Sequence, residues 1–215
     1  MLVACWSAKG GSGTTVIAAA LALSFARGPS GALLADFAGD APCVLGLSDP
    51  GGPGLSDWLD AGTSVPVDAL SRIEIEAAPG LALLPRGAHP ADAGIRADVL
   101  ASLLLGDART VVADCGVGPV GAARAVAAAA SVSLLVTRPC YVALRRALAA
   151  PLRPSGVILV SEPGRALGAG DVEDVLGVPV RAEVAVEPTV ARAVDAGLLT
   201  TRLPRSLERA LRRAA

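Results

Sequence analysis

The chain alternates short, wholly apolar runs with stretches rich in alanine and leucine, and this order constrains the fold more than any other feature. The apolar runs show no polar–apolar alternation, which is typical of parallel strands that are buried on both faces. Parallel strands need long crossover connections, and the intervening helical stretches can supply them. The sequence therefore predicts an α/β fold, with a doubly wound, mostly parallel sheet and helices on both faces.

The element boundaries follow from where each apolar or helical pattern begins and ends. The predicted strands are Leu2–Ser7, Ala32–Asp36, Leu81–Pro85, Thr110–Asp114, Ser131–Thr137, Gly156–Ser161 and a shorter one near Val178–Val184. The predicted helices are Thr15–Ala26, Leu55–Ala61, Ala91–Leu105, Val120–Ala130, Tyr141–Ala150, Gly170–Leu176, Thr189–Ala196 and Arg205–Ala214. Ile73–Glu76, followed by Ala78-Pro79-Gly80, predicts a hairpin and one antiparallel edge strand. Without an internal repeat or a long linker, residues 1–215 are expected to form a single domain.

The segment Ser7-Ala8-Lys9-Gly10-Gly11-Ser12-Gly13-Thr14-Thr15 joins the first predicted strand to the first predicted helix. Ligands of such sheets bind beyond the carboxyl ends of the strands. Glycines let backbone N–H groups turn toward phosphate oxygens, and the start of a helix adds partial positive charge. A hydroxyl at Thr15 can ligate Mg²⁺. Residues Lys9 to Thr15, the phosphate loop, are therefore predicted to bind a nucleotide.

This loop resembles the deviant Walker A loop of the MinD/ParA family of P-loop ATPases, whose pattern is K-G-G-x-G-K-[ST]. The resemblance implies binding of ATP or ADP with Mg²⁺ and a homodimer formed around the nucleotide. Lys9 matches the family's signature lysine, which reaches across the dimer interface to the partner's phosphates. Thr14 stands where the general Walker lysine belongs, and its hydroxyl cannot replace the charge of an ammonium group. Hydrolysis is therefore expected to be slow or absent.

Lys9 is the only lysine in the chain, and every other basic residue is arginine. An arginine would be bulky in a loop that closes around phosphate, whereas an ammonium group on a flexible stem fits. The composition thus indicates a specific use for the lysine at position 9. The alternative is a solvated lysine without a role.

Acidic residues end two of the predicted strands. Asp36 resembles the first aspartate of the family's Asp-x-Asp pair, which supports the metal and the attacking water, but Ala38 replaces the second. Asp40 follows in a Gly-Asp context that resembles the CpaE/TadZ branch of the family, and it either recovers part of this role or caps a turn. Asp114 ends a hydrophobic strand, where a Walker B carboxylate is expected. Asp36 and Asp40 are therefore candidates for catalysis with Lys9, and Thr15, Asp36 and Asp114 for metal binding.

The segment Val186–Gly197 resembles the late part of the family, which flanks the nucleotide base and then packs a helix. Glu187 and Pro188 are therefore expected in nucleotide binding. Where the family often places an adenine-reading asparagine, this chain has Ser161-Glu162-Pro163. Base specificity is left open by this difference.

Net charge and cysteine content bear on three further properties: nucleic-acid binding, disulfide or metal sites, and cellular location. The net charge of −1 gives no overall basicity of the kind that marks nucleic-acid-binding proteins. The four cysteines lie far apart without C-x-x-C spacing, so reduced thiols are expected rather than disulfides or a metal site. The apolar N-terminus has no basic residue before Lys9 and is predicted as a core strand, not a signal peptide. A cytoplasmic protein is expected, with peripheral association with membrane or nucleoid left open.

The C-terminal segment 203–215 carries arginines on one side and leucines on the other. Its apolar face is short and contains only leucine and alanine, so packing on the domain is predicted rather than insertion into a bilayer. Arg145, Arg146 and Arg153 are predicted as part of a solvated face. Contact of these arginines with DNA or an anionic membrane surface is the alternative.

Two functions from different classes fit these observations. The first is a positioning or partitioning switch that dimerises around ATP and Mg²⁺ and recruits or places other machinery through a protein partner. The second is a pseudo-ATPase scaffold that keeps the fold without using nucleotide, which Thr14 and Ala38 favour because each removes a charged group from the site.

Overall fold

The computed structural model describes residues 1–62, 66–90 and 96–214. Within these residues, an eight-stranded sheet has the order β3-β4-β2-β5-β1-β6-β7-β8, and its pairs are parallel except for the antiparallel pair β3–β4. The predicted α/β fold with one antiparallel edge strand is confirmed. The strands are β1 Leu2–Ser7, β2 Ala32–Asp36, β3 Ile75–Ala78, β4 Leu81–Leu84, β5 Thr110–Val117, β6 Val132–Thr137, β7 Gly156–Ser161 and β8 Val180–Ala185.

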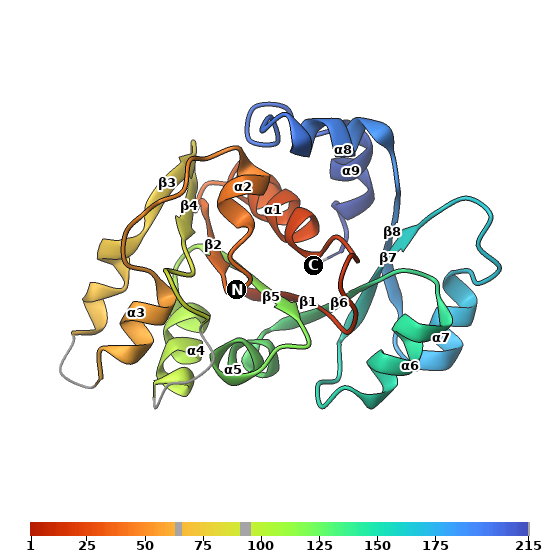
Figure 1. Ribbon diagram of the computed structural model, residues 1–215, viewed down its shortest axis with the longest axis horizontal. Coiled ribbons are helices and arrows are strands. Elements are labelled where there is room, and N and C mark those ends of the chain that lie inside the picture. Colours follow the sequence, from red (N-terminus) through yellow and green to blue (C-terminus); the bar gives the residue numbers. More distant parts are fainter. Residues whose placement is uncertain (63–65, 91–95, 215) are drawn as a thin grey trace.

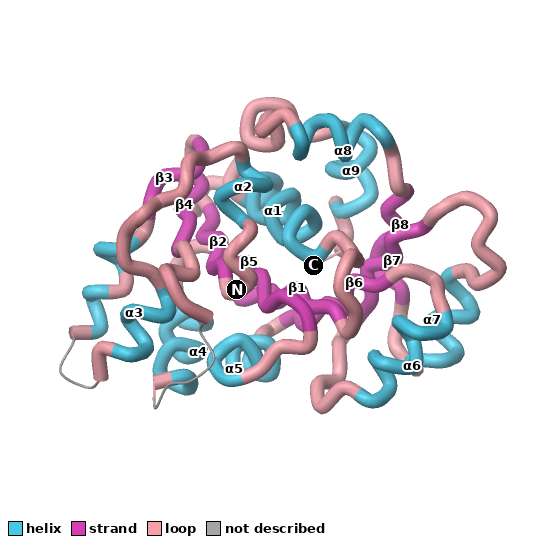
Figure 2. The backbone as a smooth tube through the Cα atoms, in the orientation of Figure 1, coloured by secondary structure: helices cyan, strands magenta, loops and turns pink. Residues whose placement is uncertain are grey.

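Helices cover both faces of this sheet, as Figure 1 shows: α1, α2, α8 and α9 lie on one face, and α3 to α7 lie on the other. Figure 2 shows the strands as a continuous band between these two layers. The helices are α1 Thr14–Phe25, α2 Ala41–Leu45, α3 Leu55–Asp60, α4 Ala97–Gly106, α5 Gly121–Ala129, α6 Tyr141–Ala149, α7 Ala169–Leu176, α8 Pro188–Asp195 and α9 Arg205–Leu211. Among the described helices, none is long and apolar enough to cross a membrane.

Strand β1 stands where the connections of the sheet change direction. The chain passes from β1 to β2 and β4 on one side, returns to β5 next to β1, and then continues to β6, β7 and β8 on the other side. Right-handed crossovers that run in opposite directions place their helices on opposite faces, which accounts for α1 on one face and α5 to α7 on the other. Ligands of such sheets bind beyond the carboxyl end of the strand at this switch point.

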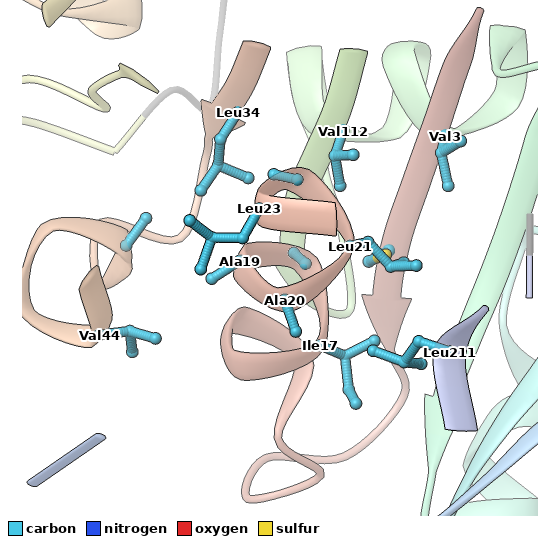
Figure 3. Packing of buried hydrophobic residues seen from close by; sticks show 14 of the residues in the cluster. Val3, Ile17, Ala19, Ala20, Leu21, Leu23, Leu34, Val44, Val112 and Leu211 are labelled. Carbon is cyan, nitrogen blue, oxygen red and sulfur yellow. The ribbon is translucent and has the colours of Figure 1, made fainter. Parts of the chain in front are cut away.

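The core forms two layers because successive side chains of a strand point to opposite faces. In β1, Leu2, Ala4 and Trp6 belong to the layer under α3 to α7, whereas Val3 and Cys5 belong to the layer under α1, α2 and α9. The second layer is shown in Figure 3. Its labelled side chains include Ile17, Leu21 and Leu23 from α1, Leu34 and Val112 from the strands, Val44 from α2 and Leu211 from α9.

Most predicted element boundaries agree with the structure to within a few residues. Strands Leu2–Ser7, Ala32–Asp36 and Gly156–Ser161 are confirmed at both ends. Strand β5 continues to Val117, beyond the predicted end at Asp114, because it keeps pairing with β1 as far as Ser7. Helix α4 begins at Ala97; the beginning predicted at Ala91 lies outside the described residues.

Candidate functional site

The phosphate loop lies beyond the carboxyl end of β1 and runs into α1. Gly11 and Gly13 have φ values of 76° and 85°, in the left-handed region that favours glycine. The space around these two residues is open, since a β-carbon added at either would meet no atom within 4 Å. The Ser12 hydroxyl donates to the Lys9 carbonyl at 2.8 Å and closes the turn. The loop therefore offers its backbone to a ligand, with the positive end of the α1 dipole behind it.

A cavity of about 410 Å³ opens beside the phosphate loop. Residues 11–16 form one side of it, and Phe37, Ala38 and Asp40, which follow β2, form another. The rest of its lining comes from the end of β5 and the start of α5, namely Cys115, Gly116, Val117, Gly118, Pro119, Val120 and Ala123. Burial raises the pKa of the Cys115 thiol, so this side chain is a neutral part of the wall.

Asp114 is fully buried at the edge of this site, in register with Asp36 of the neighbouring strand. Burial raises the pKa of Asp114 to about 7; the Thr15 hydroxyl opposes this change and the charge of Asp36 adds to it. One carboxylate oxygen, Oδ1, accepts the Gly116 N–H at 3.1 Å. The other, Oδ2, has no hydrogen-bond partner of normal geometry among the described residues. A buried carboxylate oxygen of this kind is suited to meet a cation.

Asp36 is also fully buried, but both of its carboxylate oxygens are engaged. They accept the backbone N–H groups of Gly39 at 2.6 Å and Ala41 at 3.1 Å. Burial raises the pKa of Asp36, against the opposing effect of these two hydrogen bonds and of the Arg86 charge. Asp36 therefore fixes the loop that enters α2, in addition to any part it takes in metal binding.

Asp40 was predicted either to recover part of the catalytic role or to cap a turn. This residue occupies the N-cap position of α2, yet its side chain makes no capping hydrogen bond. Its carboxylate is exposed and lines the 410 Å³ cavity instead. The turn is held by Asp36, so Asp40 is available to the cavity.

No three His, Cys, Asp or Glu side chains of the described ranges gather closely enough to hold a metal ion by themselves. Mg²⁺ is normally held by one or two carboxylates, with waters and nucleotide phosphates completing its coordination. The partnerless Asp114 Oδ2 and the nearby Thr15 hydroxyl are donors of the kind that such a site needs. The residues present therefore fit a magnesium ion that arrives together with a nucleotide.

Lys9 and Thr14 are placed differently relative to the cavity. Thr14 opens α1, is only 7% exposed and lines the cavity at the position predicted for the Walker lysine. Lys9 is partly exposed and is not among the residues that line the cavity. The only hydrogen bond of its ammonium group within the described structure is to the Gly10 carbonyl at 3.5 Å. The ammonium group of Lys9 is thus not committed to the phosphate site of its own chain.

A second, apolar pocket of about 200 Å³ adjoins the phosphate loop, with which it shares Gly13. It lies between α1 and α8, and valines form much of its lining. Glu187 lines this pocket as well, whereas Pro188 opens α8 and is not part of the lining. An apolar pocket next to a phosphate cradle suits an aromatic base. Glu162 is not part of it, because this carboxylate forms ion pairs with Arg138 and Arg165 at the end of β7.

Arg86 contributes to the site in a way that sequence reasoning missed. Its guanidinium donates to the Ala38 carbonyl at 2.7 Å and fills the space in which a β-carbon on Gly39 would lie. It therefore braces the loop between Asp36 and Asp40 from outside the cavity. Nothing in the sequence marks Arg86, since arginine is the usual basic residue throughout this chain.

No protein-family model and no curated protein sequence matches the chain. Solved structures do match it, over nearly its whole length. MinD complexed with Mg-ADP from Pyrococcus horikoshii OT3 has a TM-score of 0.77 and 20% identity, and the alignment covers 99% of this chain and 93% of that one. A ParA family ATPase from Chlorobium tepidum TLS has a TM-score of 0.75 and 20% identity, with 98% and 95% covered.

A third match is the MinC:MinD cell division protein complex from Aquifex aeolicus, with a TM-score of 0.68 and 17% identity. The alignment covers 91% of this chain and 86% of that one. The chain therefore has the fold of the MinD and ParA ATPases, as the resemblance of its phosphate loop implied.

Proposed function

We propose that this protein is a nucleotide-responsive switch of the MinD/ParA type, which binds ATP with Mg²⁺, dimerises around it and recruits or places other machinery. The observation that carries the proposal is the arrangement of the phosphate loop. Its glycines and the start of α1 form an open site for phosphate, whereas Lys9 does not line the cavity of its own chain. A second protomer facing this loop would give that ammonium group a phosphate to contact.

In the proposed complex, backbone N–H groups of residues 10–15 bind the phosphates and the apolar pocket takes the base. Thr15 and Asp114 hold Mg²⁺, which neutralises phosphate charge when it is bound. Asp40, open to the cavity, is the carboxylate best placed to orient a water molecule. Because Thr14 supplies no positive charge to the phosphates, we expect nucleotide to act mainly as a switch, with slow or absent hydrolysis.

Several features of the solved structures support this proposal. One MinD relative is complexed with Mg-ADP, and another is complexed with the protein MinC. A nucleotide site and a protein partner are therefore reasonable expectations on this fold, although a shared fold alone does not fix function. The Gly39-Asp40 pair favours the CpaE/TadZ branch for this chain, and we propose that residues 1–215 act as one domain.

The test is the oligomeric state with and without nucleotide. Gel filtration with light scattering should give a monomer in nucleotide-free buffer and a dimer with ATP and Mg²⁺. Lys9→Ala should prevent the dimer while ATP still binds, because the lysine is expected to act on the partner's nucleotide. Arg145→Ala removes an exposed cation from α6 and serves as the matched control, which should dimerise normally.

The same experiment separates the switch from the pseudo-ATPase scaffold that Thr14 and Ala38 favour. A dimer that forms without nucleotide, in a protein with no measurable ATP affinity, would support the scaffold. A monomer under all conditions, unchanged by Lys9→Ala, would contradict the switch.

A further inference from the structure

A groove of about 850 Å³ lies between α8 and the segment that leads into α9, and no residue of the phosphate loop lines it. Arg192 comes from α8, Arg202 from the connecting segment and Arg205 from the start of α9. All three residues are exposed, and none of their side chains forms an ion pair or hydrogen bond within the described structure. The groove therefore carries positive charge that the chain itself does not neutralise.

The one carboxylate that lines the groove is Glu187, and one of its oxygens, Oε2, is already engaged. Glu187 accepts the Ser206 hydroxyl at 2.7 Å and the Thr189 hydroxyl at 3.1 Å. The hydrogen bond from Ser206 joins the start of α9 to the start of α8. Glu187 thus holds the two sides of the groove in place and leaves the guanidinium groups free.

Apolar side chains lie among these arginines. Leu198 lines the groove and is 44% exposed, and Leu203 and the buried Ala193 line it as well. An exposed leucine inside a concave, charged groove offers a contact for an apolar side chain of a ligand. The groove thus combines guanidinium groups with apolar side chains.

We propose that this groove binds an acidic peptide segment of a partner protein, in which apolar side chains alternate with carboxylates. Arginine guanidinium groups pair with carboxylates in bidentate geometry, and three of them fix the position of an extended segment. Leu198 and Leu203 receive the apolar side chains of that segment. Such an interaction would give the proposed switch a docking site for the machinery that it recruits.

Other anionic partners fit this groove less well. None of its lining residues is aromatic, so it has no platform on which nucleic-acid bases could stack. A flat bilayer surface cannot follow the concave wall of the groove. A helix as short as α9 also has little apolar surface to insert into a bilayer.

Helix α8 lies between the groove and the apolar pocket beside the phosphate loop, and the two share Glu187 at the start of this helix. Val190, Ala191 and Val194 line the apolar pocket, whereas Thr189, Arg192 and Ala193 line the groove. These two sets lie on different faces of one helix, as the spacing of three and four residues dictates. If a nucleotide base enters the apolar pocket, as proposed above, a shift of α8 would couple nucleotide binding to peptide binding. This coupling rests on the proposed function, whereas peptide binding itself does not.

The experiment uses nucleotide-free protein, so that its result is independent of the proposed nucleotide switch. Fluorescence anisotropy is measured with a labelled synthetic octapeptide of aspartate and glutamate with two spaced leucines. The triple variant Arg192→Gln, Arg202→Gln and Arg205→Gln should weaken binding about tenfold or more. The double variant Arg145→Gln and Arg146→Gln removes exposed arginines from α6 and should bind normally.

The groove's two chemical properties can be tested separately. Leu198→Ser should weaken the leucine-containing peptide but not a peptide of acidic residues alone. Binding should also weaken as salt is raised, since the guanidinium–carboxylate contacts are exposed. Far-ultraviolet circular dichroism checks that each variant is folded.

Three outcomes would overturn the proposal. One is no saturable binding of the octapeptide by the wild-type protein, and another is equal binding by the triple variant. The third is arginine-dependent binding of a DNA duplex or of phosphatidylserine vesicles without binding of the peptide, which would assign the groove to that partner.

Discussion

Thr14 is the residue at which the phosphate loop departs most from the Walker A pattern that it resembles. Thr14 begins α1 and lines the 410 Å³ cavity, at the position where we expect a Walker lysine to meet the phosphates. A neutral hydroxyl stabilises phosphate less than an ammonium group does, because charge-assisted hydrogen bonds are roughly twice as strong. The loop nevertheless contains glycines whose open surroundings leave its backbone free to contact a ligand.

Thr14→Lys should therefore increase nucleotide affinity. A hydrogen bond between charged groups contributes about 1.5–3 kcal/mol, which corresponds to roughly a tenfold to hundredfold lower dissociation constant for ATP with Mg²⁺. Isothermal titration calorimetry measures this constant, and phosphate release shows whether hydrolysis accelerates too. Thr14→Met, which has a similar stem without charge, is the control. If the lysine variant binds no more tightly than the methionine variant, the loop is not a phosphate site.

Asp114 makes stability depend on pH in the metal-free protein. Its pKa is raised from an ordinary value near 3.8 to about 7 in the folded state. Below about pH 4, this carboxyl is protonated in both states. Between pH 4 and 7, the unfolded chain loses the proton while the folded chain keeps it, so the free energy of unfolding falls as pH rises. Above pH 7, the carboxyl is ionised in both the folded and the unfolded state, and its buried charge destabilises the folded state most.

Asp114→Asn should remove this dependence. In buffer with EDTA, the variant should become more stable than the wild type as pH rises, by up to roughly 4 kcal/mol at pH 8, since one pKa unit corresponds to about 1.4 kcal/mol. At pH 4 the variant and the wild type should have about the same free energy of unfolding. Urea unfolding at several pH values measures the difference between them. A constant difference across the pH range would show that Asp114 does not titrate as its burial indicates.

At the scale of elements, the central strands could be predicted from the sequence because burial on both faces leaves an uninterrupted apolar run. All of β1 is buried, and its predicted and observed ends agree. The outermost strand β8 alternates between exposed and buried residues, so its beginning was predicted less accurately. Its pattern reflects an edge position, which no local signal in the sequence specifies.

Helix α2 was missed because it is only five residues long and owes its place to tertiary contacts. Its first turn contains Pro42, and Asp36, at the end of β2, accepts the N–H of its first residue, Ala41. The sequence of this segment is too short to show the spacing of apolar residues that indicates a helix, and the contact with β2 is not visible from sequence. The same long-range contact holds the turn without the Asp40 side chain, so Asp40 makes no capping hydrogen bond, and a role for it in catalysis stays a prediction.

The residues of the candidate site were predictable where a motif fixes their spacing, and not otherwise. The phosphate loop and the strand-end carboxylates Asp36 and Asp114 follow from pattern and position. Arg86 reaches the Ala38 carbonyl from a distant part of the chain, so this contact forms only through the fold. The groove arginines lie close together in sequence, but only the packing of α8 and α9 places them around one groove. The C-terminal helix, predicted to pack on the domain, does so through Leu207 and Leu211.

The whole molecule depends on β1, because this one strand supplies side chains to both core layers. Trp6 belongs to the layer under α3 to α7, and its indole N–H donates to the Ser133 hydroxyl at 3.0 Å. Leu211, from the far end of the chain, belongs to the opposite layer and is 3% exposed. Since neither layer can persist without β1, we expect both to unfold together as one cooperative unit.

Leu211→Ala tests this expectation, because it changes one core layer while unfolding is followed in the other. Truncating a buried leucine should lower the free energy of unfolding by about 2–5 kcal/mol. In a Trp58→Phe background, Trp6 is the only tryptophan, and its fluorescence reports on the layer that Leu211 does not touch. The urea midpoint of this fluorescence should fall together with that of far-ultraviolet circular dichroism, whereas Arg212→Ala at the exposed neighbouring position should change neither. If circular dichroism shifted while the Trp6 transition stayed in place, the two layers would unfold separately, and residues 1–215 would not behave as a single domain.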